Sequence, residues 1–176
     1  MRQARRADLS PAPPGTEPLV MCLDDPRARN PNAVGGKAAS LATLRWLRLP
    51  TPDSCCLTAH AYLRHLRDGG LLEREAALRR RLPDEDVRCQ LQEMVATSDI
   101  QETLQLELDE HLAPFGDVRL AVRSSALGED AEALSFAGQH ETLLGVEQSQ
   151  LGHAICSCWA SLWSARAGAY RGRDEL

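Results

Sequence analysis

Apolar positions recur at helical spacing in two segments of the first seventy residues. The first segment, residues 36–49, follows a glycine pair, and Pro50 and Pro52 end its apolar face. Thr58 is a suitable N-cap for the second helix, which the pattern extends to the glycine pair at 69–70. We therefore expect two helices here, separated by a short extended segment.

A long charged segment, residues 71–113, predicts three further amphipathic helices. The first is expected to end at Pro83, Asp84 to cap the second, and Ser98 to begin the third. The glutamates and arginines between the apolar positions are interpreted as a solvated face.

Strand patterns surround and follow these helices. Short apolar or alternating runs at 19–23, 54–58, 118–124 and 142–146 are of strand length, and a last apolar helix is expected over about 148–170. The order of elements predicts an α/β (α+β) fold, in which a small mixed sheet is flanked by helices.

Composition narrows the class of protein. The 176 residues suit one domain, or one lobe of a larger enzyme, and 43% apolar residues are enough for a core. Charges interrupt every apolar run before it reaches the length of a membrane span, so we expect no membrane partner. The net charge of −5 argues against nucleic-acid binding as the main activity.

The composition of the first residues is typical of an unpacked terminal segment. Residues 1–18 contain four prolines, and we expect them to be a disordered, Pro-rich segment before a domain at 19–176. No apolar secretory segment is visible there, so we expect a cytoplasmic protein with cysteines that are reduced and mostly buried. The six cysteines have no spacing typical of a zinc site, so no metal ligands are assigned.

The single lysine, Lys37, marks the first candidate site, since the other 19 basic residues are arginines. It follows Gly35-Gly36 at the start of an expected helix, where backbone N–H groups and the helix field favour an anion. The segment lacks the P-loop pattern, and a simple Gly-Gly turn is the alternative interpretation.

The second candidate site is the segment 122–146. Its strand carries Arg123 to the point where a Ser- and Gly-rich loop begins, and a guanidinium there could bind a phosphate through two hydrogen bonds. Small donors and open amides are the composition that a phosphate-covering loop needs. Glu129-Asp130 is interpreted as a solvated turn rather than as a pair of metal ligands.

Three motifs in order resemble one protein family. They are AVGGKAASLATL at 33–44, the Val-Arg-Ser-Ser to Ala-Gly-Gln stretch at 122–139, and the Trp-Ala-Ser-Leu-Trp-Ser pattern at 159–171. Together they resemble the N-terminal ATP-binding domain of the pyruvate phosphate dikinase and phosphoenolpyruvate synthase family, which includes rifampicin phosphotransferase. The resemblance implies the N-terminal lobe of an ATP-grasp domain.

The resemblance also implies roles for individual residues. The positions that match ATP-binding positions of the family are Lys37, Arg123, Gly138 and Thr142. The first two match cations that hold ATP phosphates, and the other two match the loop that closes over the nucleotide. Ser135 and Gln139 are expected to help shape that loop. No catalytic residue is assigned.

The chain also departs from the family pattern. The segment after the first helix, residues 49–55, differs from the usual Val-Pro-Pro-Gly-Phe type. In the family, the residues that bind Mg²⁺ and the phosphorylated histidine lie beyond the length of this chain. We therefore expect an ATP-binding lobe of a phosphotransferase that is catalytically incomplete, with the other domains of a longer or split enzyme as partners. The alternative is a non-catalytic nucleotide- or protein-binding module, and self-association is expected in either case.

Overall fold

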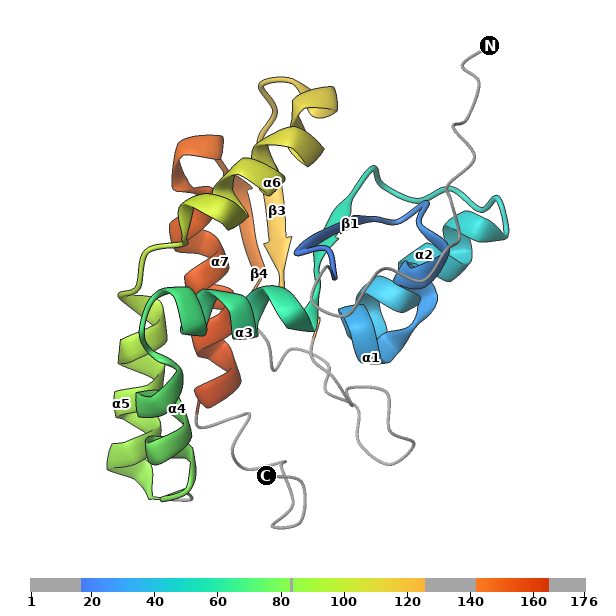
Figure 1. Cartoon of the computed structure of the whole chain (residues 1–176). Coiled ribbons are helices and arrows are strands. Elements are labelled where there is room, and N and C mark those ends of the chain that lie inside the picture. The colour runs from blue at the N-terminus through green and yellow to red at the C-terminus, as the bar shows by residue number, and fades with distance from the viewer. Residues whose placement is uncertain (1–16, 83, 126–141, 165–176) are drawn as a thin grey trace.

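The structure, a computed structural model of the whole chain, describes residues 17–82, 84–125 and 142–164 (Figure 1). The expectations for the tail before residue 17, for Gly138 and its neighbours and for the chain after 164 lie outside these residues. Within them the chain is a mixed α/β structure of helices packed on short strands, as the periodicity predicts.

The four expected strands are present, but they form two antiparallel pairs rather than one mixed sheet. Strand β1 (Val20–Cys22) pairs with β2 (Cys55–Leu57), and β3 (Leu120–Arg123) pairs with β4 (Thr142–Val146). The expectation of a single mixed sheet is therefore wrong for the described residues.

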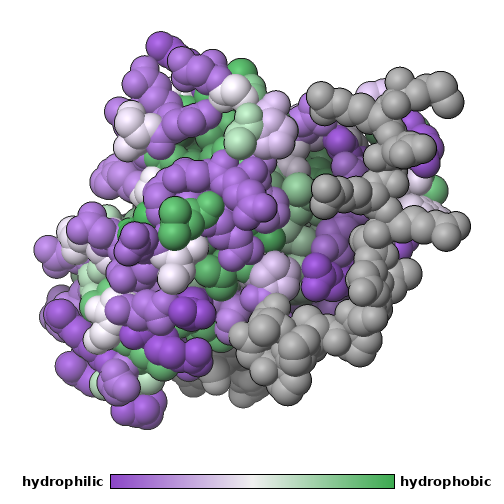
Figure 2. Space-filling model, turned by 45° about the horizontal axis from the view of Figure 1, so that its top comes forward, coloured by the Kyte–Doolittle hydropathy of each residue, from purple (hydrophilic) through white to green (hydrophobic). Residues whose placement is uncertain are grey.

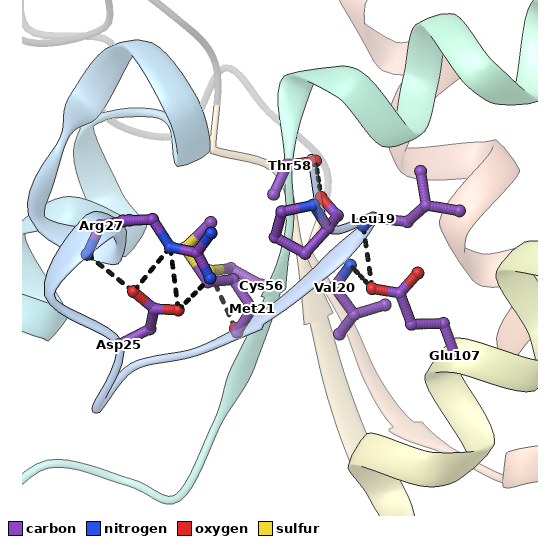
Figure 3. A network of polar contacts seen from close by, with 9 residues as sticks. Leu19, Val20, Met21, Asp25, Arg27, Cys56, Thr58 and Glu107 are labelled. Atoms are coloured by element: carbon purple, nitrogen blue, oxygen red, sulfur yellow. Dashed lines mark hydrogen bonds and ion pairs between the residues drawn. The ribbon is translucent and has the colours of Figure 1, made fainter. Parts of the chain in front are cut away.

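A side chain at the edge of β1 gives the physical reason. The carboxylate Oε1 of Glu107 accepts hydrogen bonds from the backbone N–H groups of Leu19 and Val20, each at 2.9 Å (Figure 3). The Val20 N–H faces the open edge of β1, so this helix side chain satisfies it and it does not pair with a third strand.

The first helices pack on one face of the β1–β2 pair. They are the 3₁₀ turn η1 (Pro26–Arg29), the one-turn helix α1 (Pro31–Val34) and α2 (Gly36–Trp46). Met21 and Cys56 face the core that these helices form, together with small residues such as Ala38 and Ala42. Asp25 caps η1 by accepting a hydrogen bond from Arg27 N and also pairs with its guanidinium (Figure 3).

The other face of the pair packs on the main core. This core joins Val20 to residues of α3 (Ala59–Asp68), α6 (Glu102–Leu112) and α7 (Leu151–Ala160). Thr58 caps α3 as expected, since its hydroxyl accepts a hydrogen bond from Ala61 N at 3.2 Å. Short 3₁₀ turns precede and follow these helices: η2 (Ala113–Phe115), η3 (Gln148–Gln150) and η4 (Ser161–Trp163).

A third cluster closes the end of the molecule that lies away from α2 (Figure 1). It joins α4 (Leu72–Arg79) and α5 (Glu85–Ala96) to the end of α7 and to Trp163. Asp84 caps α5 as predicted, accepting hydrogen bonds from two backbone N–H groups. The exposed sides of these helices are charged, and the face seen in Figure 2 is mostly hydrophilic with scattered hydrophobic areas.

Several helix boundaries differ from the prediction. The last helix, expected over about 148–170, is α7 (Leu151–Ala160), and the 3₁₀ turn η4 follows it. Ser98 does not begin the third charged helix: α6 begins at Glu102, because the Ser98 hydroxyl donates to Val95 O at 2.7 Å and contacts the His65 ring instead. Helix α2 ends at Trp46 rather than near residue 49, and Arg48 takes a positive φ of 62° after it.

Burial also differs from expectation at several polar side chains. Glu75 on α4 is 4% exposed, although the glutamates of this segment are expected to be solvated, and His65 on α3 is 1% exposed. Of the six cysteines, only Cys156 and Cys158 are buried, so the expectation that most are buried is wrong. Among the described residues, no helix has the length and apolar character needed to cross a membrane.

Candidate functional site

The first half of the candidate site is the junction between α1 and α2. Asn30 caps α1 through its side chain, and the helix ends after one turn at Gly35. Gly35 has φ 79° and ψ 164°, a backbone conformation that favours glycine, and the chain then enters α2 at Gly36. This turn places Lys37 in the first turn of α2, as the sequence predicts.

The second half is the end of the β3–β4 pair. Arg123 is the last residue of β3, and its cross-strand partner is Thr142, the first residue of β4. Opposite residues in an antiparallel pair project to the same face, so both side chains lie on one side of this end. Both residues are exposed.

These two halves meet through two polar contacts, although 87 positions separate the residues that form each one. The Nζ of Lys37 lies 3.4 Å from the carbonyl oxygen of Ser124, and the backbone N–H of Ala38 donates to Ser125 Oγ at 3.1 Å. The structure therefore brings Lys37 to the residue that follows Arg123. Of the four predicted ATP-binding residues, Lys37, Arg123 and Thr142 belong to these two joined halves.

Gly35 makes this approach possible. A Cβ at Gly35 would lie 1.9 Å from the carbonyl oxygen of Ser125 and 2.5 Å from its Oγ. From the sequence, the glycine pair is expected to admit an anion, whereas in the structure Gly35 admits the Ser125 backbone that follows β3.

The polar groups around the junction differ in burial. Gly35 and Gly36 are buried, Lys37 is half-buried, and Ser124 Oγ is shielded from solvent. Ser124 Oγ is a buried side-chain hydroxyl without a hydrogen-bond partner in the described part of the chain. A buried hydroxyl without a hydrogen-bond partner carries a cost in free energy.

The arrangement suits an anion. Lys37 lies in the first turn of α2 and contacts Ser124, the residue after Arg123, so two cationic residues belong to the segments that meet at this junction. No group of three His, Cys, Asp or Glu side chains close enough to hold a metal occurs in residues 17–82, 84–125 and 142–164. The groups that the described residues present to a phosphate are side-chain cations and backbone or hydroxyl donors.

One residue of the junction was recognised only in part from the sequence. Ser125 was counted among the small donors of the second segment, but its role as the cap of α2 was not predicted. No local pattern could reveal this contact, since its partner Ala38 is far away in the sequence. The signal that could have suggested it is Gly35, an N-cap residue that has no side chain to cap the helix itself.

Comparison with known proteins identifies the family. The model of the pyruvate phosphate dikinase AMP/ATP-binding domain matches residues 31–176. The chain belongs to this family. The match covers both halves of the candidate site, and it confirms the resemblance deduced from the three sequence motifs.

Similar proteins agree with this assignment of an AMP/ATP-binding domain. The chain is 37% identical over 154 residues to the prodigiosin synthesizing transferase PigC of Serratia marcescens, an alignment that covers 86% of this chain and 16% of that protein. It is 36% identical over 169 residues to a rifampicin phosphotransferase of Streptomyces, covering 90% and 19%. It is 31% identical over 155 residues to a probable phosphoenolpyruvate synthase of Methanothermobacter thermautotrophicus, covering 81% and 23%. The chain thus spans about a fifth of the length of these relatives.

Proposed function

We propose that this AMP/ATP-binding domain is the lobe of a phosphotransferase that binds the phosphates of ATP, and that it has the ATP-grasp type of fold. The observation that carries the proposal is the contact between Lys37 Nζ and the Ser124 carbonyl oxygen, which joins the two sequence segments expected to bind phosphate. The family match supports the nucleotide as ligand.

Lys37 is proposed to bind a phosphate oxygen directly. The contact of Lys37 Nζ with the Ser124 carbonyl oxygen is long for a hydrogen bond, since N–H···O distances cluster near 2.9–3.0 Å and this one is 3.4 Å. A charge-assisted bond to a phosphate oxygen is shorter and about twice as strong as a bond to a neutral acceptor. Exchange of the carbonyl for a phosphate is therefore favourable, and the N-terminus of α2 adds to the attraction.

Arg123 is proposed to bind a second phosphate oxygen from the other side of the junction. It is exposed at the end of β3, where a planar guanidinium can offer two parallel N–H donors. Thr142, opposite it in the ladder, is proposed to contribute its hydroxyl, and Gly138 to belong to the loop that closes over the nucleotide.

In a longer enzyme, this site would hold ATP while a phosphoryl group passes through a histidine to an acceptor such as pyruvate. The printed names of the relatives, which include transferases and phosphoenolpyruvate synthases, support this class of reaction. We propose that the chain alone does not complete the transfer, and that Mg²⁺ binds together with residues outside the described set. Phosphoryl transfer depends on positioned charge at both the leaving and the attacking oxygen.

The proposal is tested by calorimetric titration of the purified chain with ATP and, separately, with adenosine. We expect ATP but not adenosine to bind, and Arg123→Ala to weaken ATP binding by about 1–2 kcal/mol. Arg67→Ala, at an exposed arginine on α3, is the matched control and should leave binding unchanged. Equal binding of adenosine and ATP would contradict a phosphate site.

A non-catalytic binding module is the second candidate, and a particular surface favours it. At and after the end of α2, Trp46, Leu47 and Leu49 are 63%, 53% and 50% exposed. Exposed large apolar side chains that lie together mark contact surfaces, so this segment is proposed to contact the remaining domains of a longer enzyme or a second copy of the chain. Light scattering of the chain and of Trp46→Ser at increasing concentration distinguishes self-association from a monomer.

We also propose that the protein is cytoplasmic. All six cysteines are free in the structure, which fits a reducing compartment. Labelling with a membrane-permeant thiol reagent in intact cells would test this proposal, and we expect the cysteines to react as free thiols there, as they do in a reduced cell lysate.

A further inference from the structure

Two cysteines face each other across the β1–β2 pair. The register of this antiparallel ladder places Cys22 opposite Cys55, as it places Val20 opposite Leu57 and Met21 opposite Cys56. Cys22 is exposed, Cys55 is half-buried, and both are free thiols.

The hydrogen bonds around the ladder show whether Cys22 and Cys55 are a hydrogen-bonded or a non-hydrogen-bonded pair. Thr58 N donates to Leu19 O at 3.0 Å, so the Leu19–Thr58 position is hydrogen-bonded. Cys22 O points away from β2, because it accepts from Asp25 N at 3.0 Å. Since hydrogen-bonded and non-hydrogen-bonded pairs alternate, Cys22 and Cys55 form a non-hydrogen-bonded pair, with a usual Cα–Cα distance of about 4.5 Å. That distance lies within the range of about 4.4–6.8 Å that a disulfide spans.

Core contacts confirm which face each thiol occupies. Val20, Cys55 and Leu57 pack toward the main core with α6 and α7. Cys56 packs toward α1 and α2 on the opposite face, where its Sγ donates to Met21 O at 3.2 Å. Successive residues of a strand point to opposite faces, so Cys22 and Cys55 share a face that Cys56 does not.

We propose that Cys22 and Cys55 are a redox-active dithiol that oxidises to a cross-strand disulfide in the presence of a peroxide. The Cys22 thiolate attacks one oxygen of hydrogen peroxide and breaks the O–O bond, which gives a sulfenic acid and hydroxide; the hydroxide takes up the proton that the thiol released and becomes water. The Cys55 thiolate then attacks the Cys22 sulfur and displaces the hydroxyl group as a second water once it takes up a proton. In sum, two thiols and one peroxide give one disulfide and two waters.

The environment of the two thiols slows their oxidation at neutral pH. Burial raises the pKa of the Cys55 thiol to about 11, with a smaller contribution from Cys22. Burial also raises the pKa of Cys22, followed by the carboxylates of Asp24 and Asp25, while Arg45 acts in the opposite direction. Because the thiolate is the reactive form, oxidation should be slow at neutral pH and faster at alkaline pH.

The disulfide would close the loop that carries the phosphate-binding turn. Cys22 and Cys55 are the two ends of a segment that contains η1, α1 and α2, and therefore Gly35 and Lys37. A cross-link that closes a loop of this length removes entropy from the unfolded chain. The oxidised protein should therefore resist heat better than the reduced protein.

The experiment treats the purified chain at pH 8.5 with one equivalent of hydrogen peroxide, blocks the remaining thiols and maps the linked peptides by mass spectrometry. We expect the peptide of Cys22 to be joined to the peptide of Cys55, and the melting temperature to rise by about 5–10 °C, reversibly with dithiothreitol. Cys22→Ser and Cys55→Ser should each abolish the link and the shift.

Cys56→Ser and Cys89→Ser are the matched controls, and both should retain the link and the shift. Cys56→Ser also removes the ambiguity of adjacent cysteines in one peptide. A bond between Cys55 and Cys56, dimers linked through Cys89, or oxidation of Cys22 to a sulfinic acid without a link to Cys55 would each overturn the proposal.

Discussion

Ser125 caps helix α2 by accepting a hydrogen bond from the backbone N–H of Ala38 at 3.1 Å, although the two residues are 87 positions apart. The N-cap residue of the helix is Gly35, which has no side chain for this purpose. The start of the helix that carries Lys37 is therefore completed by the end of strand β3, and the two halves of the phosphate site depend on each other.

Removal of the Ser125 hydroxyl should weaken both the fold and the site. We expect Ser125→Ala to lower the free energy of unfolding by about 1 kcal/mol, the usual cost of losing an N-cap hydroxyl. Urea denaturation measures the change, and Ser149→Ala, at an exposed serine in η3, is the control and should cost less than about 0.5 kcal/mol. Equal effects of the two substitutions would mean that the contact does not stabilise α2.

Gly35→Ala tests the close approach between the two halves. The new Cβ would meet the Ser125 carbonyl oxygen at 1.9 Å, so either the β3 end or the turn must move. Gly70→Ala is a matched control, because Gly70 has a similar positive φ of 66° but no atom within 4 Å of the added Cβ.

We expect Gly70→Ala to cost about 1 kcal/mol from backbone strain alone, and Gly35→Ala to cost at least about 2 kcal/mol more. Urea denaturation of both variants gives the difference. If both lose the same amount, the approach of Ser125 to Gly35 does not persist in solution.

Glu107 should contribute more to the free energy of unfolding than an ordinary surface glutamate does. Its carboxylate satisfies the backbone N–H groups of Leu19 and Val20, both at buried residues. Glu107→Ala leaves these donors without that acceptor, and we expect a loss of about 2–4 kcal/mol in the free energy of unfolding. Glu110→Ala, at an exposed position of the same helix, should change stability by less than about 0.5 kcal/mol. A small effect at both positions would contradict the role of Glu107 at the edge of β1.

The buried His65 predicts a pH dependence of stability. Ser98 donates its hydroxyl hydrogen to Val95 O, so His65 Nε2 must donate to Ser98 Oγ and Nδ1 carries the bare lone pair. Nδ1 is buried without a hydrogen-bond partner among the described residues, and burial lowers the pKa of His65. Protonation would place a charge and an unpaired N–H in the core.

Because the folded pKa is the lower one, the unfolded chain takes up the proton first as the pH falls. This contribution to stability is present above the ordinary histidine pKa of about 6.5 and is lost as the pH falls below it. Unfolding free energies between pH 7.5 and 5 should fall more steeply for the natural chain than for His65→Gln. His153→Gln, at an exposed histidine of α7, should keep the steep slope. An unchanged slope in His65→Gln would show that other groups cause it.

Local signals in the sequence predict most helices, because their caps and stops are encoded in adjacent residues. Thr58 and Asp84 cap α3 and α5 as expected, since each side chain bonds a backbone N–H within three positions. Lys37 and Arg123 were selected for their residue types and neighbours, and the structure places them in two segments that meet.

The features that the sequence did not predict depend on distant partners. In the sequence, Glu107 has the pattern of a solvated helix glutamate, and only the packing of α6 beside β1 shows its contact with Leu19 N. Ser98 has the pattern of an N-cap, but in the fold its hydroxyl bonds Val95 O and contacts the His65 ring. The separation into two strand pairs has the same origin, because a helix side chain satisfies the edge of β1. Periodicity describes one element at a time, so contacts of this kind require the fold.

The most direct test of the account is titration of the purified chain with ATP at low salt, for the natural protein, Lys37→Ala and Lys37→Arg. We expect a dissociation constant between about millimolar and high micromolar for the natural chain, equivalent to a binding free energy of about 4–6 kcal/mol. Lys37→Ala should bind more weakly, and Lys37→Arg should not restore the affinity fully, because a planar guanidinium does not replace a compact ammonium. ATP binding that is tight and unaffected by Lys37→Ala would show that the nucleotide binds elsewhere and would contradict the proposed site.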